Sequence, residues 1–344
     1  MKKIIVAPLN WGLGHASRCV PIIIALLENG YTPVLASDGN ALKLLKKEFP
    51  NLDALELPSY HISYGKSVKR TLFFKTFSIL KAVKEERKLL NTYLNQNADI
   101  VGIISDNRFG MYSQKIPSVY ITHQINVLSG IFTPITSYFH RRIIHRFNEC
   151  WIPDNEGSKF SGKLSASKKK LRQKYIGILS RLKQNPLELN VDVLIVLSGP
   201  EPNRSQLEEK LKELFKETSR RVWLVRGVIE ERQVIEEYGS VKTFNFMQSK
   251  ELETALNSSK FVICRSGYSS IMDLISLNKK ALLIPTKGQN EQEYLANYLQ
   301  AKNYFGWVSE EKLNHETLKV LDDSFGIDYQ EKKIDPKLFD LFST

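Results

Sequence analysis

The amino-acid sequence predicts an α/β protein of two Rossmann-like, doubly wound domains that face each other across a cleft. Three observations lead to this fold class. The chain has 344 residues, enough for two domains of ordinary size. Short apolar runs alternate with longer amphipathic stretches, which is typical of parallel sheets with helical crossovers. The alternation stops over residues 155–173, a segment rich in serine and lysine, and then resumes.

In the first half, strands are expected at short runs rich in isoleucine, valine and leucine, and helices at amphipathic stretches. The expected strands cover residues 3–8, 32–36, 52–57, 100–105 and 118–122. The expected helices cover residues 15–29, 41–48 and 71–95. Gly30 is a suitable C-terminal cap for the first of these helices.

The second half repeats the alternation. Its expected strands cover residues 191–197, 221–225, 241–246, 261–264, 281–284 and 305–308, and its first two helices cover residues 205–217 and 230–238. We therefore divide the chain into an N-terminal domain (1–157), a linker region (158–190), a C-terminal domain (191–325) and a terminal segment (326–344) that could return to the first domain.

Charge is distributed unevenly between the two halves. The net charge of +12 results from +16 over residues 1–185 and −4 over residues 186–344. This asymmetry suggests an anionic partner for the first half. The composition, 42% apolar and 25% charged, excludes a disordered chain.

Cysteine spacing and hydropathy indicate the compartment. Cys19, Cys150 and Cys264 lie too far apart for a CxxC metal site and are odd in number, so a reducing cytoplasm fits best. Residues 116–140 carry no formal charge, but their prolines and amides do not suit a membrane span. We expect a cytoplasmic protein, with peripheral attachment to the inner face of the membrane as an option.

The loop after the first strand contains a candidate catalytic base. Gly12 and Gly14 allow a ligand to approach the backbone closely, and His15 stands in the first turn of a helix. The helix dipole favours a neutral imidazole there, which could act as a general base for a hydroxyl group. The alternative is an ordinary N-terminal helix residue. A nicotinamide dinucleotide site is not indicated, because the third glycine of its fingerprint is missing.

Asp106 is the second catalytic candidate, because it ends a strand in the same half. If the sheet brings it beside His15, its carboxylate could orient the imidazole ring and stabilise the imidazolium. The alternative is that Asp106 caps the turn over residues 107–110.

The most informative segment of the second half follows the expected strand 261–264. Its candidate ligand groups are Arg265, Ser266, Gly267, Ser269, Ser270 and Asp273. The serines and the amides of a helix start suit a phosphate, and a carboxylate one turn further along could bind a ribose diol. Plain helix capping is the alternative.

Two further turns follow strands in this half. Glu291 and Gln292 offer an acceptor and an amide for sugar hydroxyls, although glutamate is also favoured in any first helical turn. Ser198 and Gly199 could approach a diphosphate, or form a simple turn.

Together these motifs resemble the inverting nucleotide-sugar glycosyltransferases of the GT-B fold. The likeness is greatest to family 28, which includes the lipid-linked N-acetylglucosaminyltransferases of peptidoglycan synthesis, and more distant to the glucuronosyltransferases. Arg265-Ser266-Gly267-x-x-Ser270-x-x-Asp273 is similar to the family's Arg-Ser-Gly-x-x-Thr-x-x-Glu. Pro285, Glu291-Gln292 and Ala296-Asn297 resemble its Pro…Asp-x-Gln…Asn-Ala element, and Gly12-x-Gly14-His15 resembles its glycine loop.

The resemblance implies a nucleotide-sugar donor, such as a UDP-sugar, bound by the second half without metal or other cofactor. Phe246 and Met247 would flank the base, and Asp273 would bind the ribose. His15 would be the base, and Asp106 its helper as in the glucuronosyltransferase-like branch. Asp273 stands where the family has Glu. The second half lacks the family's Gly-Gly-Ser loop, and the loop before His15 lacks its double glycine. The identity of the donor therefore stays open.

Residues 68–90 combine basic residues with Leu, Ile and Phe, so this stretch could lie on an anionic membrane or a lipid-phosphate acceptor. The alternative is an amphipathic helix with its aromatic side in the core. No nucleic-acid-binding module is visible. Two other functions remain open at this point, a nucleotide-sugar 2-epimerase of the same fold and a non-catalytic nucleotide-sugar-binding protein.

Overall fold

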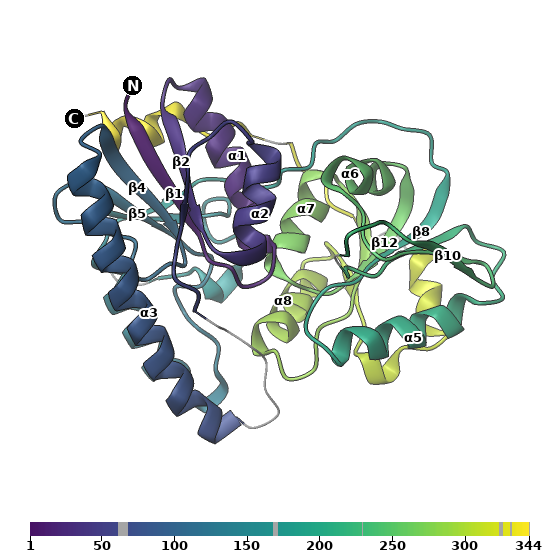
Figure 1. Ribbon diagram of the computed structural model, residues 1–344. Helices are drawn as coiled ribbons and strands as arrows, with labels where there is room; N and C mark the ends of the chain where they lie inside the picture. The colour runs from purple at the N-terminus through teal and green to yellow at the C-terminus, as the bar shows by residue number, and fades with distance from the viewer. Residues whose placement is uncertain (61–67, 168–170, 229, 323–325, 331, 344) are drawn as a thin grey trace. The chain divides into compact units, whose positions relative to one another are not determined.

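The computed structural model describes residues 1–60, 68–167, 171–228, 230–322, 326–330 and 332–343; of residues 68–77 and 320–322 it describes the backbone only. The chain forms two compact units (Figure 1). Unit 1 comprises Met1–Arg181 and Lys332–Thr344, and unit 2 comprises Leu182–Glu331. Each unit contains a sheet of mainly parallel strands covered by helices, so the predicted fold class is confirmed.

Unit 1 is built on a seven-stranded parallel sheet with the order β3-β2-β1-β4-β5-β6-β7. The strands are β1 (Lys3–Pro8), β2 (Thr32–Ser37), β3 (Ala54–Glu56), β4 (Ile100–Asp106), β5 (Ser118–Ile121), β6 (Glu149–Ile152) and β7 (Gln173–Tyr175). The order reverses between β1 and β4. In sheets of this type ligands bind where the order reverses, beyond the carboxyl ends of the strands.

Helices cover both faces of this sheet (Figure 1). They are α1 (Gly14–Glu28), α2 (Gly39–Glu48), α3 (Val68–Gln96) and α4 (Thr133–Ile144), with short 3₁₀ turns η1 (Gly130–Phe132) and η2 (Gly162–Leu164). The alternation of side chains along β1 explains the two layers. Ile4 and Val6 pack in the core that contains α1, whereas Ile5 and Ala7 pack in the core that contains Leu90 of α3.

The end of the chain packs into unit 1. Residues Pro336–Phe342 form the 3₁₀ helix η5, and the rings of Phe339 and Phe342 are buried against Trp151. The ring of Phe342 occupies the space beside Gly102 of β4, where a Cβ atom would overlap it. The first unit therefore completes its core with residues from the far end of the sequence.

Unit 2 has a second seven-stranded sheet, with the order β10-β11-β9-β8-β12-β13-β14. Its strands are β8 (Val191–Val196), β9 (Val222–Val225), β10 (Ile235–Tyr238), β11 (Val241–Phe244), β12 (Ser259–Cys264), β13 (Lys280–Leu283) and β14 (Gly306–Trp307). Its helices are α5 (Asn203–Phe215), α6 (Ser249–Asn257), α7 (Tyr268–Ser276) and α8 (Asn290–Ala301), followed by the 3₁₀ turns η3 (Glu310–Lys312) and η4 (Thr317–Asp322). All strand pairs are parallel except β10–β11.

The helix predicted over residues 230–238 is wrong. The end of this segment is the strand β10, which pairs antiparallel with β11, Tyr238 opposite Val241. Gly239 lies at the turn between them with a φ of 57°, a conformation that favours glycine and closes a hairpin. A glutamate-rich run followed by Gly is ambiguous between a helix end and such a turn.

The boundary between the units lies inside the predicted linker region. Residues 158–181 belong to unit 1, since β7 extends its sheet and Ile176 and Leu179 join its core. No strand was predicted at β6 or β7, and no helix was predicted at α4. Within the described part of the chain, no helix has both the length and the hydropathy needed to cross a membrane.

The buried ring of Phe342 gives a test of the terminal packing. We expect Phe342→Ala to destabilise the protein by about 3–5 kcal/mol, because a fully buried ring leaves a cavity. Gly102→Ala should also destabilise the wild type, but much less in the Phe342→Ala background, where space has opened. Urea denaturation of the two single variants and the double variant measures this coupling. Phe132→Ala, at a ring that is 60% exposed, is the control, and additive effects would contradict the contact.

Candidate functional site

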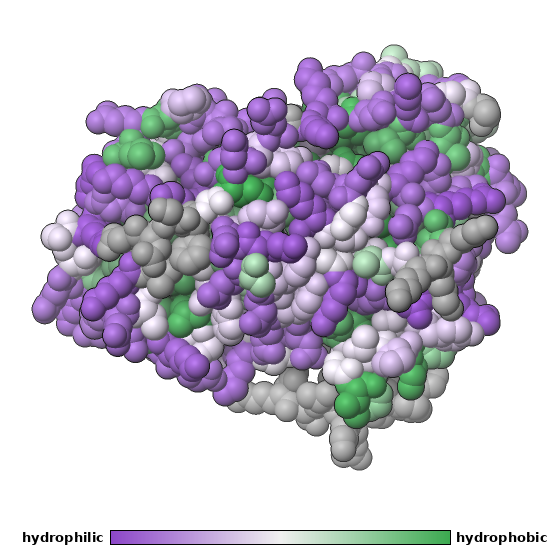
Figure 2. Space-filling view, turned by 180° about the vertical axis from the view of Figure 1, so that it is seen from behind, coloured by the Kyte–Doolittle hydropathy of each residue, from purple (hydrophilic) through white to green (hydrophobic). Residues whose placement is uncertain are grey.

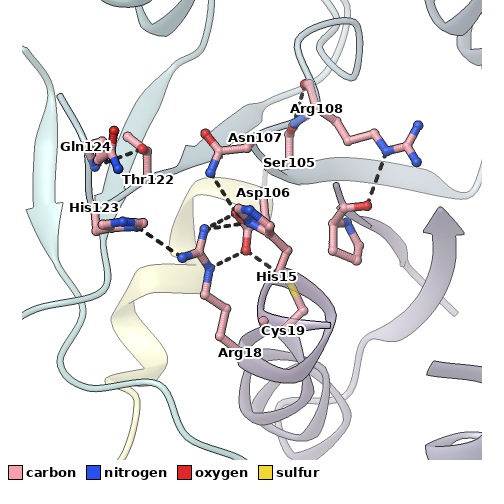
Figure 3. A network of polar contacts seen from close by, with 12 residues as sticks. His15, Arg18, Cys19, Ser105, Asp106, Asn107, Arg108, Thr122, His123 and Gln124 are labelled. Atoms are coloured by element: carbon pink, nitrogen blue, oxygen red, sulfur yellow. Dashed lines mark hydrogen bonds and ion pairs between the residues drawn. The ribbon is translucent and has the colours of Figure 1, made fainter. Parts of the chain in front are cut away.

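The carboxyl edge of the first sheet brings His15 and Asp106 together. Strands β1 and β4 are neighbours, with Pro8 opposite Asp106, and α1 begins shortly after β1. His15 Nδ1 lies 2.9 Å from Asp106 Oδ1 (Figure 3). The two catalytic candidates, 91 residues apart in the sequence, are thus in direct contact.

The glycine loop and the start of α1 hold His15 in place. Gly12 has a φ of 72°, a conformation that few other residues adopt easily, and α1 begins at Gly14. No side chain caps this helix start, and its first turn contains no acidic residue. The first amides of α1 are therefore suited to an anion.

Arg18 completes the site, although it was not among the residues predicted from the sequence. Its Nε lies 2.5 Å from Asp106 Oδ2, and a terminal nitrogen of the same guanidinium bonds Oδ1. Asp106 is fully buried and Arg18 is 2% exposed. Burial alone would raise the pKa of Asp106, but the charges of Arg18 and His15 outweigh it and hold this pKa below its ordinary value. Asp106 therefore stays ionised.

The Nδ1 atom of His15 has two neighbours that compete for it. It lies 2.9 Å from Asp106 Oδ1 and also 2.9 Å from the Nη2 atom of Arg18. Arginine can only donate, and a carboxylate can only accept. When Nδ1 carries the proton and donates it to Asp106, Nε2 keeps a lone pair and can act as a base. When Nδ1 accepts from Arg18, the proton of a neutral ring is on Nε2.

Two further histidines lie at the same edge. His123, two residues after β5, accepts at Nδ1 from Arg18 over 3.2 Å, which requires an unprotonated Nδ1 (Figure 3). His140 of α4 lies 3.1 Å from the hydroxyl of Tyr120, which in turn bonds Asn107. Burial lowers the pKa of His140 to about 4, so it is neutral at physiological pH.

A second buried arginine fastens the adjoining loops. Arg108 is fully buried, bonds Asp38 after β2, and contacts Glu86 of α3 over 2.8 Å. It also donates to the carbonyl oxygens of Pro8 and Pro58. This cluster joins the ends of β1 and β2 to α3, and so supports the edge on which His15 stands.

In unit 2 the residues that were predicted to bind the diphosphate lie at one edge of the sheet. Ser198 and Gly199 are exposed after β8, and Gly199 has a φ of 107°. β12 is the neighbour of β8, and α7 begins directly after it, with Gly267 at the N-cap and no side chain capping the helix. Ser269 and Ser270, in the first turn, are half-buried. The uncapped amides of α7 suit an anion.

Other residues that were predicted to bind the sugar donor make hydrogen bonds within unit 2. Arg265 is 1% exposed and donates to Glu310 and to the carbonyl oxygen of Asn203, each over 2.8 Å. Ser266 donates to the carbonyl oxygen of Gln292, and the Gln292 side chain accepts from the amide of Thr286. These groups hold the ends of β12 and β13 to α5, η3 and α8.

The remaining donor candidates are partly accessible. Asp273, in the second turn of α7, and Glu291, in the first turn of α8, are half-buried, and Met247 is half-buried after β11. Phe246 has both main-chain groups engaged, its amide with Asn245 and its carbonyl oxygen with Gln233. Among the described residues, no group of three or more His, Cys, Asp or Glu side chains could hold a metal ion.

Thr286, at the same edge, was not predicted. It is 2% exposed, and its hydroxyl has no hydrogen-bond partner in the described structure. Its Oγ1 lies about 4.0 Å from the position that a Cβ atom on Gly199 would take. The only sign that Thr286 could belong to a binding site is its unsatisfied hydroxyl beside a glycine turn. This proximity becomes visible only when the order of β8, β12 and β13 in the sheet is known.

Comparisons with known proteins agree with this architecture. Residues 204–325 match the family model of the glycosyltransferase family 28 C-terminal domain. The chain is 24% identical over 337 residues to UDP-N-acetylglucosamine–N-acetylmuramyl-(pentapeptide) pyrophosphoryl-undecaprenol N-acetylglucosamine transferase of Clostridium botulinum, covering 90% of this chain and 86% of the relative.

Two solved structures share the fold. The calicheamicin glycosyltransferase CalG4 has a TM-score of 0.65 at 10% identity, and MurG of Acinetobacter baumannii has a TM-score of 0.57 at 12% identity. Each alignment covers 94% of this chain and 90% of the other. The resemblance predicted from the sequence is confirmed.

Burial of His140 predicts how stability depends on pH. Its pKa of about 4 in the native state lies below the ordinary value of 6.5, so the unfolded chain binds the extra proton between these values. Stability therefore falls as the pH drops from about 6.5 to 4, by about 3 kcal/mol for this group. Urea unfolding at a series of pH values should show a smaller fall for His140→Gln. His315→Gln, at an exposed position, is the control, and parallel curves for wild type and His140→Gln would contradict the assignment.

Proposed function

We propose that this chain, a GT-B glycosyltransferase of the family-28 type, transfers a sugar with inversion from a nucleoside-diphosphate donor, a UDP-sugar, to a hydroxyl group of a lipid-linked or anionic acceptor. The observation that carries the proposal is the contact of His15 with the buried, ionised Asp106 at the carboxyl edge of unit 1. This arrangement provides a positioned base, and the edge is where such folds bind ligands.

His15 Nε2 takes the proton of the acceptor hydroxyl as the oxygen attacks the anomeric carbon. The new carbon–oxygen bond forms on the face opposite the leaving group, and the bond to the diphosphate oxygen breaks with its electron pair. Asp106 accepts from Nδ1–H and stabilises the imidazolium. Arg18 already balances the charge of Asp106, so a proton on His15 makes the cluster net positive. This positive charge favours release of the proton from His15 to solvent.

Unit 2 is the proposed donor site. The amides at the start of α7, with Ser198, Gly199, Ser269 and Ser270, would hold the diphosphate and stabilise its developing charge, so the proposal needs no metal. Asp273 would bind the ribose diol, and Phe246 and Met247 would flank the base. Glu291 and Gln292 would contact the sugar, with Gln292 exchanging its present bond to the Thr286 amide. Arg265, Ser266 and Gly267 would support this turn.

The acceptor belongs to unit 1 in this proposal. The relative from Clostridium botulinum is named for a UDP-N-acetylglucosamine donor and a pyrophosphoryl-undecaprenol acceptor. The net charge of +16 over residues 1–185 suits an anionic diphosphate of this kind, and a location at the inner face of the membrane. No comparable observation supports the two alternatives, a nucleotide-sugar 2-epimerase or a non-catalytic nucleotide-sugar-binding protein.

Removing the proposed base tests the mechanism. We expect His15→Ala to lower turnover by about 10²–10⁴-fold, because general base catalysis is lost, while donor binding persists. The measurement is release of nucleoside diphosphate in the presence of acceptor. His315→Ala, at an exposed histidine of unit 2, should behave as wild type. Unchanged turnover in His15→Ala would remove His15 from the mechanism.

Donor recognition can be tested separately. A thermal-shift screen of nucleotide sugars should reveal a donor that stabilises the protein by about 2.7 kcal/mol at a hundredfold excess over its Kd. Asp273→Asn should weaken that donor by about tenfold, because a charged hydrogen bond to the ribose becomes neutral. Glu217→Gln, at an exposed position two residues after α5, is the control. Equal donor affinity in Asp273→Asn would exclude the ribose contact.

A further inference from the structure

Thr286 carries a buried hydroxyl without a hydrogen-bond partner. The residue follows β13, and its side chain is only 2% exposed. Its main chain is engaged on both sides, because its amide donates to Gln292 Oε1 and its carbonyl oxygen accepts from the amide of Gln289. The hydroxyl oxygen makes no hydrogen bond within the part of the chain that the structure describes. The loop is thus held in place around a polar atom that has no partner.

Such a hydroxyl destabilises the free protein. Hydrophilic residues dominate the surface seen in Figure 2, where water can satisfy their polar groups. The hydroxyl oxygen of Thr286 is closed to water, and no bond within the described structure compensates for its lost hydration. A ligand atom that accepts from this hydroxyl gains a hydrogen bond without first displacing water from it. The site is therefore prepared for an acceptor that the free chain does not supply.

The position of the hydroxyl indicates which acceptor it would meet. β12 lies between β8 and β13 in the sheet. Thr286 Oγ1, on the loop after β13, lies about 4.0 Å from the position that a Cβ atom on Gly199, after β8, would take. These two loops therefore meet over the carboxyl end of β12, where α7 begins with uncapped amides after Gly267. Three neighbouring strand ends thus converge on one place that suits an anion.

There is room for a ligand atom beside the hydroxyl and the Gly199 turn. In the described structure, Thr286 Oγ1 is the only atom beyond this turn that lies within 4 Å of the Cβ position on Gly199. An oxygen that came about 1 Å closer would accept from the hydroxyl at an ordinary distance. Ser198 and Gly199 are exposed, and glycine changes its backbone angles at little cost, so the turn can move to admit it.

The charges near this edge make a neutral donor important. Arg265 pairs with Glu310 over 2.8 Å, and Lys287 pairs with Glu311 over 2.7 Å. Both cations are therefore already compensated within unit 2. A diphosphate here would rely on amides and hydroxyls, and a hydrogen bond to an ionised oxygen is stronger than one between neutral groups.

We propose that Thr286 is a diphosphate-binding residue, whose hydroxyl donates to a non-bridging phosphate oxygen held between the Gly199 turn and the start of α7. This inference deepens the proposed function and rests on its donor site in unit 2. The same hydrogen bond strengthens as the sugar leaves, because negative charge then develops on the diphosphate. Gln292, whose side chain accepts from the Thr286 amide, positions the loop for this contact.

The experiment measures two properties of the full-length chain, the binding of inorganic pyrophosphate by titration calorimetry and the thermal unfolding of the free protein. Thr286→Val keeps the shape of the side chain and removes the hydroxyl. We expect it to bind pyrophosphate about 10–100-fold more weakly, because a hydrogen bond to a charged oxygen is lost. The free variant should unfold about 2–4 °C above the wild type, because an unsatisfied polar atom has been removed.

Two further variants separate binding from packing. Thr286→Ser keeps the hydroxyl and loses a buried methyl group, so it should unfold below the wild type and bind pyrophosphate within about twofold of it. Thr243→Val is the matched control in unit 2. Thr243 is also 2% exposed, but its hydroxyl donates to the carbonyl oxygen of Glu236 over 3.0 Å. This control should be less stable than the wild type, with unchanged binding.

The inference is overturned if the wild type does not bind pyrophosphate, or if Thr286→Val binds it as the wild type does. It is also overturned if Thr286→Val lowers the unfolding temperature as Thr243→Val does, since the hydroxyl then has a partner in the free chain. Pyrophosphate contains neither base nor sugar, so this measurement does not depend on the transfer reaction. A chain that binds pyrophosphate through Thr286 but transfers no sugar from any UDP-sugar would contradict the proposed function alone.

Discussion

The paired charges of Arg18 and Asp106 are the constraint on which unit 1 depends. A carboxylate without exposure to water is strongly unfavourable unless a cation and hydrogen bonds compensate it, and the guanidinium supplies both through two parallel contacts. The pair fixes α1 against the end of β4, and its outer nitrogens reach His15 and His123. The geometry of the proposed base is therefore set by a contact that also holds the fold together.

Sequence periodicity was sufficient for most of the architecture, since β1 has the predicted bounds Lys3–Pro8, His15 follows this strand, and Asp106 ends β4. Periodicity does not show which strands are neighbours in the sheet, or which distant side chains are in contact. Arg18 lies three residues after His15 on one helix face, but its partner becomes visible only when β1 and β4 are known to be neighbours. His123 follows β5 by the same rule as Asp106 and was overlooked. The strand β10 depends on a hairpin turn at Gly239 that outweighs local helix propensity.

In unit 2, the side chains that define the family motif have structural contacts of their own. Arg265 joins Glu310 to the start of α5, and Ser266 and Gln292 hold α8 against the ends of β12 and β13. The motif therefore maintains the edge on which a donor would lie, as well as offering groups to it. A loss of donor binding after substitution of Arg265 would be difficult to separate from a change in this edge. Asp273 and the α7 amides are the groups whose effects can be interpreted more directly.

The return of residues 332–344 to unit 1 affects how the protein can fold during synthesis. The first 181 residues emerge from the ribosome long before Phe339 and Phe342, yet both rings belong to the core around α1. Domains commonly fold as they emerge, N-terminal first. Here the first unit must wait with part of its apolar surface uncovered until unit 2 has been made. Its nascent form is therefore a candidate client for chaperones, and loss of the last few residues would leave the amino-terminal unit, not its neighbour, incomplete.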